Sequence, residues 1–365
     1  MTNWVSEKLN MLSSFDKYAR SENGNDSQDF LKLDANENFM LKKGFISQIA
    51  LRAAKNTDLR EYPSEQFEEL YRQLAKYTGI DKKYLAIGNG SDQIIELILS
   101  TIGKGQRVNV FTPTFSYFIN RCELHGLTVN RLQLNKKDNT LNKGEFLQSA
   151  KQCDIVYICS PNNPTGNQFD RRSILEIMDA IEDKLVLIDE AYVEFANYSL
   201  ESYASTRYDN VIVLRTLSKA FGLAGARVGY FISNRRFAEI FRSTIQSPYP
   251  LNSLSLTIAA TVLSQSHYIK QTIKMIKAER KRVFDQLVQF NGIKVFHSDA
   301  NFIFFESNEK YGTILKSLKR AKLVVKAFGN IDDRKGCIRV TIGTKNMNNK
   351  FLKSVEKAVY EYPHS

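Results

Sequence analysis

Short apolar runs alternate with helical patterns between residues 84 and 232. Five runs are apolar or β-branched almost throughout, in "YLAIGNG", "VNVFTPTF", "DIVYICSP", "KLVLIDEAY" and "NVIVLRTLSK". An apolar run of this kind is typical of a strand that is covered on both faces, whereas a half-exposed strand alternates. Helix-like stretches such as "RRSILEIMDAIED" lie between the runs. Strands that alternate with helices predict a mostly parallel α/β sheet with right-handed crossovers.

The pattern changes after about residue 250. A long helical stretch over 253–290 precedes strand-like "NFIFFES", helix-like "YGTILKSLKRA", strand-like "LVVKAF" and "CIRVTIGT", and a closing helix "MNNKFLKSVEKAVYEY". This order is typical of a smaller α+β unit. We therefore expect a large α/β domain over residues 34–250, with a mostly parallel central sheet flanked by helices. Residues 1–33 and 251–365 form the expected small domain, in which "SENGNDSQD" (21–29) has the composition of a disordered segment.

Composition narrows the class of protein. The chain has 365 residues, of which 43% are hydrophobic and 25% are charged, as in a globular protein. No window approaches the length of an apolar membrane helix, and the first fifteen residues lack the apolar core of a secretory signal. The four cysteines form no C-x-x-C pair and have no histidine at metal-binding spacing. We expect a cytoplasmic protein with no membrane partner, no structural metal and no disulfide framework.

The net charge of +12 lies mostly in the last hundred residues. Lys270, Lys274, Lys277 and Lys281 follow one face of the expected helix. A solvated helix face explains this spacing, and no helix-turn-helix, zinc-finger or RNA-recognition pattern accompanies the charge. A positive potential would equally attract anionic small molecules. We expect small-molecule substrates and no nucleic-acid partner.

Candidate chemistry follows the expected strands. Ligands of open α/β sheets bind outside the carboxyl ends of the strands, so the residues there are informative. Gly90, Ser91 and Asp92 begin a helix after the first strand, which suits either a phosphate or an ordinary helix cap. Asp189 ends a buried strand, where a carboxylate needs a cation or donors, and a salt bridge to an arginine would also meet that need. Tyr192 can place a phenol near the same point.

A lysine follows the fifth run. Thr216, Ser218 and Lys219 end that run, and Arg227 comes eight residues after the lysine. A lysine whose pKa is lowered by burial or by a nearby cation can form a Schiff base with an aldehyde. Together with a phosphate-type helix start and a buried acid, this set fits a ligand with a phosphate, an aldehyde and a ring nitrogen. Pyridoxal 5′-phosphate (PLP) has these three groups.

At this point six motifs resemble one family in the same order. They are "GNGSDQIIE" (88–96), "SPNNPTG" (160–166), "DEAY" (189–192), "TLSKAFGLAGARVGY" (216–230), "SDANFI" (298–303) and "IRVTIGT" (338–344). The chain resembles the fold-type I PLP aminotransferases, closest to the histidinol-phosphate aminotransferases, from "KLDANEN" (32–38) to near its end. The resemblance implies the PLP-transferase fold, with 34–250 as the PLP-binding domain.

The resemblance also implies residue roles. Lys219 would hold PLP covalently and act as the general base, Asp189 would pair with the ring nitrogen, and Tyr192 would contact the ring hydroxyl. The other expected cofactor contacts are Asn163 at the ring hydroxyl, Phe115 against the ring face, Gly90, Ser91, Asp92, Thr216, Ser218 and Arg227 around the phosphate, and Tyr62 at the phosphate of a partner subunit. A homodimer is thereby implied.

The expected substrate contacts are Arg339, Lys326 and Asn38. Family members usually carry arginine thirteen residues before the position of Arg339, where this chain has Lys326, and a lysine lacks the bidentate fork of arginine. Phe39 replaces a proline that usually follows Asn38, which puts the segment over the active site in question. These departures concern the substrate and leave the expected PLP contacts unchanged.

The implied activity is transfer of an amino group between glutamate/2-oxoglutarate and histidinol phosphate/imidazole-acetol phosphate in histidine biosynthesis. An aromatic amino-acid aminotransferase and a PLP-dependent decarboxylase of phosphorylated threonine remain alternatives. A basic, nucleic-acid-associated protein without catalysis is a third, which the retained Lys219, Asp189 and Asn163 disfavour.

Overall fold

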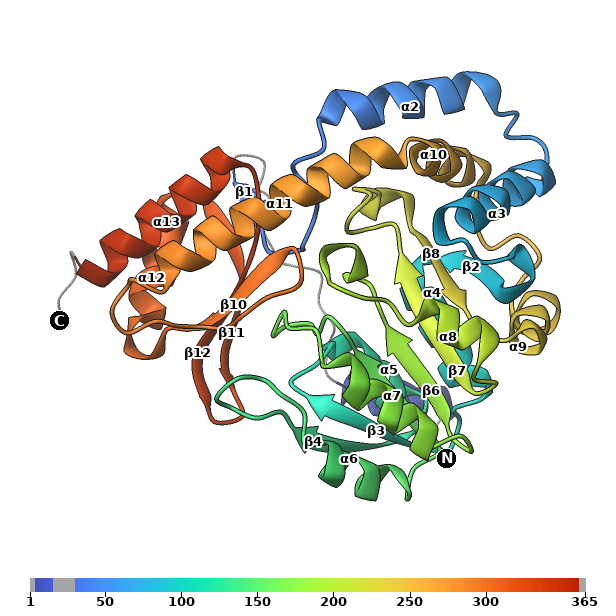
Figure 1. Cartoon of the computed structure of the whole chain (residues 1–365), viewed down its shortest axis with the longest axis horizontal. Helices are drawn as coiled ribbons and strands as arrows, with labels where there is room; N and C mark the ends of the chain where they lie inside the picture. Colours follow the sequence, from blue (N-terminus) through green and yellow to red (C-terminus); the bar gives the residue numbers. More distant parts are fainter. Residues whose placement is uncertain (1–3, 16–29, 361–365) are drawn as a thin grey trace.

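The computed structural model describes residues 4–15 and 30–360 (Figure 1). The polar segment 21–29 lies outside the described residues. Along the chain the helices, strands and short helical turns (η) are α1 Trp4–Ser13, β1 Leu31–Leu33, α2 Lys43–Asn56, α3 Ser64–Thr78, η2 Lys82–Tyr84, β2 Leu85–Asn89, α4 Gly90–Thr101, β3 Arg107–Thr112, α5 Ser116–Leu124, β4 Thr128–Gln133, α6 Lys143–Ala150, β5 Ile155–Cys159, α7 Arg171–Ala180, β6 Leu185–Asp189, η3 Val193–Phe195, α8 Glu201–Thr206, β7 Val211–Thr216, η4 Ala224–Ala226, β8 Val228–Ile232, α9 Arg235–Ile240, η5 Phe241–Ile245, α10 Ser253–Ser264, α11 Ser266–Leu287, β9 Lys294–Val295, β10 Phe302–Glu306, η6 Asn308–Lys310, α12 Tyr311–Arg320, β11 Leu323–Ile331, β12 Arg334–Thr341 and α13 Lys345–Tyr360.

The larger sheet has seven strands in the order β2-β8-β7-β6-β5-β3-β4. β8 is antiparallel to both of its neighbours, and every other pair of adjacent strands is parallel. Helices cover both faces of this sheet (Figure 1). The expected α/β class with a mostly parallel central sheet is confirmed.

The strands of the larger sheet are buried on both faces, as their apolar runs predict. In β6, Val186 and Ile188 pack into one apolar cluster and Leu187 packs into the other. Because β2, β5, β6 and β7 run in the same direction, their carboxyl ends lie along one edge of the sheet. The polar residues that follow these strands are therefore brought together.

The smaller sheet has five strands in the order β1-β11-β12-β10-β9. β1 pairs parallel with β11, whereas the pairs among β11, β12, β10 and β9 are antiparallel. Helices α12 and α13 pack on each other beside this sheet (Figure 1). The pairing of β1 with β11 joins residues 31–33 to the C-terminal third of the chain.

The helical stretch 253–290 is divided, where the sequence predicted one long helix. α10 ends at Ser264 and α11 begins at Ser266, because Gln265 leaves helical geometry at φ −103°, ψ 28°. α10 packs on α2 and α3. α11 extends from there to α13, which lies beside the smaller sheet (Figure 1). The division of the chain at residues 34–250 stays a prediction, since α10 follows residue 250 and packs beside elements that precede it.

No helix within residues 4–15 and 30–360 combines the length and the hydropathy that a bilayer span requires. All four cysteines are buried and free.

Candidate functional site

Asp189 ends β6 with its carboxylate buried. The Tyr157 hydroxyl donates to Asp189 Oδ2 at 2.8 Å, and the Ala191 backbone N–H donates to Oδ1 at 3.1 Å. Burial raises the pKa of Asp189 to about 6, and these two hydrogen bonds oppose the rise. The carboxylate is therefore mostly ionised at neutral pH. Donor hydrogen bonds hold it, and no arginine or lysine among the described residues forms an ion pair with it.

Glu190, the next residue, points to the opposite face of the sheet and takes the ion pair. Arg215 Nε donates to Glu190 Oε2 at 2.9 Å, and Arg215 Nη2 donates to Glu201 Oε2 at 2.7 Å. Glu194 also contacts this guanidinium, at 3.4 Å. The salt bridge to an arginine, an open alternative for Asp189, is thus made by Glu190 instead. The same pairing leaves Asp189 available on the other face.

Lys219 lies three residues beyond β7, beside the segment that connects β1 to α2. Its Nζ donates to the Ala35 carbonyl oxygen at 3.0 Å and lies 5.9 Å from the centre of the Tyr192 ring. Burial, followed by the nearby positive charge of Arg339, lowers the pKa of Lys219 to about 8. A substantial fraction of this amine is consequently neutral and nucleophilic just above neutral pH.

The N-terminus of α4 is closely packed and uncapped. A Cβ on Gly90 would lie 2.6 Å from Arg227 Nη2, and a Cβ on Gly229 would lie 2.2 Å from the Ser91 nitrogen. Gly90 also has a φ of +74°, which glycine adopts without strain. Asn89 precedes the helix without a side-chain cap. The Asn89 side chain thus leaves the backbone N–H groups of this first turn without a cap, as the phosphate prediction requires.

Charged and hydroxyl side chains surround this helix start. Arg227, at the left-handed φ of +54°, forms an ion pair of 2.7 Å with Asp92. Thr216 Oγ1 donates to Ser218 Oγ at 3.0 Å and accepts from the Ser218 backbone N–H at 3.1 Å. Arg227 can supply a positive charge to a phosphate, while the Asp92 carboxylate repels one and offers only its backbone N–H. The residues present thus fit a phosphate-bearing group.

Tyr192 is buried and edge-on to Phe302, with ring centres 5.1 Å apart. Its hydroxyl oxygen accepts a hydrogen bond of 2.9 Å from Asn36 Nδ2. Asn36 is in turn bonded to Thr341 on β12. The tyrosine is thereby held between the two sheets.

Arg339 on β12 and Lys326 on β11 are directly opposite each other in an antiparallel pair. Arg339 is buried; it donates to the Asn163 side-chain oxygen and to the Asp34 carbonyl oxygen. Lys326 is exposed. Opposed residues of an antiparallel pair share one face, so the two cations are neighbours. The guanidinium also lies 5.3 Å from the centre of the Phe302 ring.

Three expected site residues differ in their surroundings. Asn38 is buried: its amide donates to the Ala220 carbonyl oxygen at 2.7 Å, and its oxygen accepts from the Met40 backbone N–H at 3.0 Å. Those bonds give Asn38 a structural place, and its contact with substrate stays a prediction. Phe115 is half-buried directly before α5. Tyr62 is 78% exposed and stacks on Tyr249, with ring centres 4.6 Å apart.

Three residues that the sequence did not predict hold the predicted site residues in place by hydrogen bonds. Tyr157 supports Asp189, and Asn36 with Thr341 supports Tyr192. Tyr157 lies two positions before Cys159, where β5 ends, so both side chains are on the same face of the strand, and this alternation was the available signal. The only sequence signal for Asn36 was its position within "KLDANEN" (32–38), where the resemblance to the family begins.

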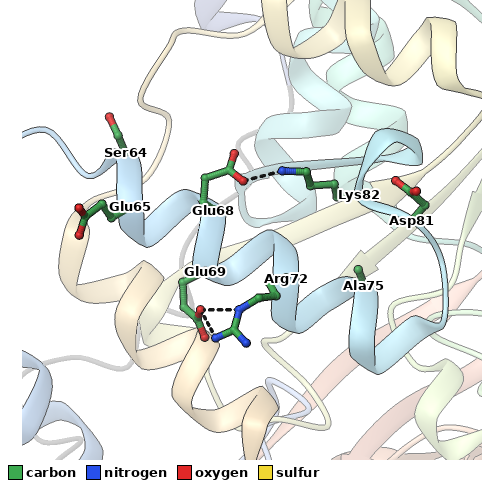
Figure 2. Close-up of a pocket in the computed structure, with 8 residues that line it drawn as sticks. All are labelled: Ser64, Glu65, Glu68, Glu69, Arg72, Ala75, Asp81 and Lys82. Carbon is green, nitrogen blue, oxygen red and sulfur yellow. Dashed lines mark hydrogen bonds and ion pairs between the residues drawn. The ribbon is translucent and has the colours of Figure 1, made fainter.

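A separate groove of about 800 Å³ lies along α3. Figure 2 shows the Glu68–Lys82 ion pair of 2.6 Å and the contact between Glu69 and Arg72 on its wall. None of the residues predicted to contact PLP or substrate lines this groove. Both of its basic side chains, Arg72 and Lys82, are paired with glutamates of α3, and the groove is distinct from the site at the strand ends.

Comparison with known proteins gives the class. Residues 28–355 match the family of class I and II aminotransferases. The chain belongs to this family and is an aminotransferase, a class of enzyme that uses PLP as its cofactor.

Individual relatives are more specific. The chain is 34% identical to a histidinol-phosphate aminotransferase of Ruminiclostridium cellulolyticum, covering 93% of this chain and 95% of that protein. It is 36% identical to one of Caldanaerobacter subterraneus subsp. tengcongensis, covering 89% and 92%. The crystal structure of the histidinol-phosphate aminotransferase from Clostridium acetobutylicum superposes with a TM-score of 0.82 at 24% identity, covering 91% and 100%. The last comparison speaks for the fold alone.

Proposed function

We propose that the chain transfers an amino group between glutamate/2-oxoglutarate and histidinol phosphate/imidazole-acetol phosphate, as a step of histidine biosynthesis. The main observation in favour of a phosphate-bearing substrate is the position of two cations, Arg339 and Lys326. They are opposite each other on β12 and β11 and share one face, beside the residues proposed to bind PLP. A substrate that carries a phosphate suits two adjacent positive charges. The two relatives of 34% and 36% identity, each called a histidinol-phosphate aminotransferase, support the same substrate.

When bound, PLP supplies an aldehyde to which amines add and a ring that accepts electron density. Lys219 is proposed to bind the aldehyde, because its pKa of about 8 leaves part of the amine unprotonated. When it is not bonded to the aldehyde, the same Nζ would be the base that moves the proton of the substrate α-carbon. Asp189, ionised above about pH 6, is proposed to hold the proton on the ring nitrogen.

The other proposed contacts orient the cofactor. Tyr192 and Asn163 would donate to the ring hydroxyl, and Phe115 would cover one ring face. The first turn of α4 would bind the phosphate, with the set described above: Gly90, Ser91, Asp92, Thr216, Ser218 and Arg227. Arg339 already contacts Asn163, so the cation proposed for substrate and an amide proposed for the cofactor are directly connected.

A panel of single amino-group transfers tests the substrate. The PLP-loaded enzyme is mixed with histidinol phosphate, phenylalanine, tyrosine, glutamate or O-phosphothreonine, and the change in cofactor absorbance is followed. We expect kcat/KM for histidinol phosphate to exceed that for phenylalanine by at least about tenfold, because a charged hydrogen bond contributes about 1.5–3 kcal/mol. A faster reaction with phenylalanine would replace this proposal with the aromatic aminotransferase. Release of carbon dioxide from O-phosphothreonine would replace it with the decarboxylase.

We further propose a cytoplasmic homodimer in which Tyr62 reaches the phosphate of the partner subunit's cofactor. The exposure of Tyr62 and of the adjacent Tyr249 supports a contact outside this chain. Light scattering gives the mass of the assembly. In a mixed dimer of one Tyr62→Phe subunit and one Lys219→Ala subunit, one shared site combines the intact Lys219 of the first subunit with the intact Tyr62 of the second. The other site has lost both residues. Activity of that mixed dimer at about half the wild-type level is expected, and an inactive mixture would contradict the shared site.

A further inference from the structure

Asn36 lies between β1 and α2 in an unusual backbone conformation. It is 1% exposed and has a φ of +56°, in the left-handed region that asparagine adopts more readily than other residues with a side chain. Glycine would adopt this conformation with less strain. A side chain at this position therefore calls for a reason other than the turn itself.

Hydrogen bonds fix the Asn36 side chain and backbone from several directions. Its backbone N–H donates to Thr341 Oγ1 at 3.0 Å, and Thr341 Oγ1 donates to its side-chain oxygen at 3.3 Å. Asn301 Nδ2 donates to its carbonyl oxygen at 2.8 Å. Since the side-chain oxygen faces Thr341, the amide nitrogen must face Tyr192, to which it donates at 2.9 Å.

The direction of this last bond constrains the tyrosine. An amide nitrogen can only donate, so the Tyr192 hydroxyl is the acceptor and its own proton must point elsewhere. Burial raises the pKa of Tyr192, so the hydroxyl keeps that proton at neutral pH. Lys219 Nζ lies over the ring of the same tyrosine. The hydroxyl proton is thus directed away from Asn36.

We propose that Asn36 is a positioning residue that turns the Tyr192 hydroxyl proton toward the cofactor and links its direction to Thr341 on β12. The inference rests on the proposed role of Tyr192 at the ring hydroxyl of PLP. A hydrogen bond donated to the anionic ring oxygen stabilises that anion and lowers its pKa. Asn36 would then favour the anion by holding the donor in one orientation. A residue that served only to form the turn would leave this ionisation unchanged.

The test is the pH dependence of the absorbance of the bound cofactor in Asn36→Gly. Glycine keeps the left-handed backbone and removes the amide. We expect the midpoint of the absorbance change to rise by about half a pH unit, because the ring oxygen loses part of a donor. Asn308→Gly is the matched control, since Asn308 is an exposed asparagine with a φ of +44° at the start of η6, after β10. Its midpoint is expected to equal that of the wild type.

A double-mutant cycle with Tyr192→Phe separates the proposals. Tyr192→Phe alone is expected to raise the midpoint by about one unit or more, and Asn36→Gly is expected to add nothing in that background. An equal shift from Asn36→Gly with and without the Tyr192 hydroxyl would overturn the positioning role. No shift from Tyr192→Phe would instead overturn the assignment of Tyr192 to the ring oxygen.

Thr341→Val is the second variant if Asn36→Gly fails to fold. Valine keeps the branched shape and removes the hydroxyl that holds Asn36. We expect a smaller rise of the same midpoint, again dependent on the Tyr192 hydroxyl. A midpoint identical to that of the wild type would contradict the proposed link to β12. Thermal unfolding of the apoprotein, measured in parallel, reports any loss of stability separately from the spectroscopic shift.

Discussion

Replacing Tyr157 by phenylalanine removes one hydroxyl from behind Asp189 and changes little else. The tyrosine is fully buried and stacks on Phe118 with ring centres 3.7 Å apart, a contact that phenylalanine keeps. The lost interaction is the 2.8 Å hydrogen bond to Asp189 Oδ2. The Ala191 backbone N–H still donates to the other oxygen. Tyr157→Phe is therefore expected to make the carboxylate less stable without displacing it.

The size of the effect follows from the bond that is lost. A hydrogen bond to a charged group contributes about 1.5–3 kcal/mol, and 1.36 kcal/mol corresponds to one pKa unit. Asp189 begins with a pKa of about 6 in the free protein. The substitution is expected to raise that pKa by about one to two units, so that much of the carboxyl group is protonated at pH 7. A protonated Asp189 cannot attract the protonated ring nitrogen proposed to lie against it.

PLP binding across pH is the assay. In the wild type we expect affinity to decline as the pH falls below about 6, and in Tyr157→Phe this decline should begin one to two pH units higher. At pH 7 the dissociation constant should rise about two- to tenfold, for a shift of one to two units, whereas at pH 9 the two proteins should agree closely. Tyr230→Phe is the matched control, because Tyr230 is also buried in the sheet and its hydroxyl has no partner among the described residues. Equal pH profiles for all three proteins would refute the role given to Tyr157.

Three further outcomes are expected. Lys219→Ala should leave a protein whose PLP is removed by dialysis and not fixed by borohydride; retention of reduced PLP on the chain would place the covalent attachment elsewhere. Lys326→Arg should raise kcat/KM several-fold for phosphate-bearing substrates and not for phenylalanine, because arginine can bind two phosphate oxygens at once; a uniform change would remove Lys326 from the phosphate contacts. Glu194→Gln should raise the unfolding free energy of the apoprotein by up to about 3 kcal/mol above pH 8 and by little near pH 4.5. Burial raises the pKa of Glu194 from 4.5 to about 7. The folded protein is therefore stabilised by the proton on Glu194, and this stabilisation is lost as the pH rises through 7, whereas glutamine stays neutral. A constant difference from pH 4.5 to 8 would contradict the last expectation, which urea unfolding at several pH values measures.

The class of fold could be predicted because a strand that is buried on both faces of a sheet has an almost continuous apolar sequence. The five runs that were recognised became β2, β3, β5, β6 and β7. β4 was missed because it is an edge strand with mostly exposed residues, so its polar composition resembles a loop. β8 was missed because it lies inside the glycine-containing motif that ends in "RVGY", where the functional pattern hid a buried strand.

The break between α10 and α11 lay beyond the reach of periodicity. No glycine or proline marks Gln265, and the apolar residues on both sides continue a helical pattern. The two helices diverge because α10 covers α2 and α3 while α11 packs toward α13, a choice made by partners that are distant in the chain. Tertiary packing overrides local helix preference at such a point.

The site was predictable to the extent that each residue follows a strand. Asp189, Thr216 and Lys219 come together because parallel strands end on one edge, which the alternation of strands and helices already implied. Which of the two neighbouring acids pairs with an arginine depends on the fold: Glu190 pairs with Arg215, and Asp189 accepts from Tyr157. Both outcomes were compatible with the spacing alone.

Tyr157 and Asn36, which the sequence did not predict, each donate a hydrogen bond to a residue proposed to contact the cofactor. Tyr157 donates to Asp189 and Asn36 donates to Tyr192, so each group proposed to meet the ring accepts a hydrogen bond from behind. Tyr157 thereby stabilises the charge on Asp189, whereas Asn36 determines where the Tyr192 proton points. Neither donor lies near the residue it supports in sequence, since 32 and 156 positions separate the partners. A motif therefore predicts which groups meet the cofactor, while the ionisation and orientation of those groups depend on side chains that are distant in the sequence.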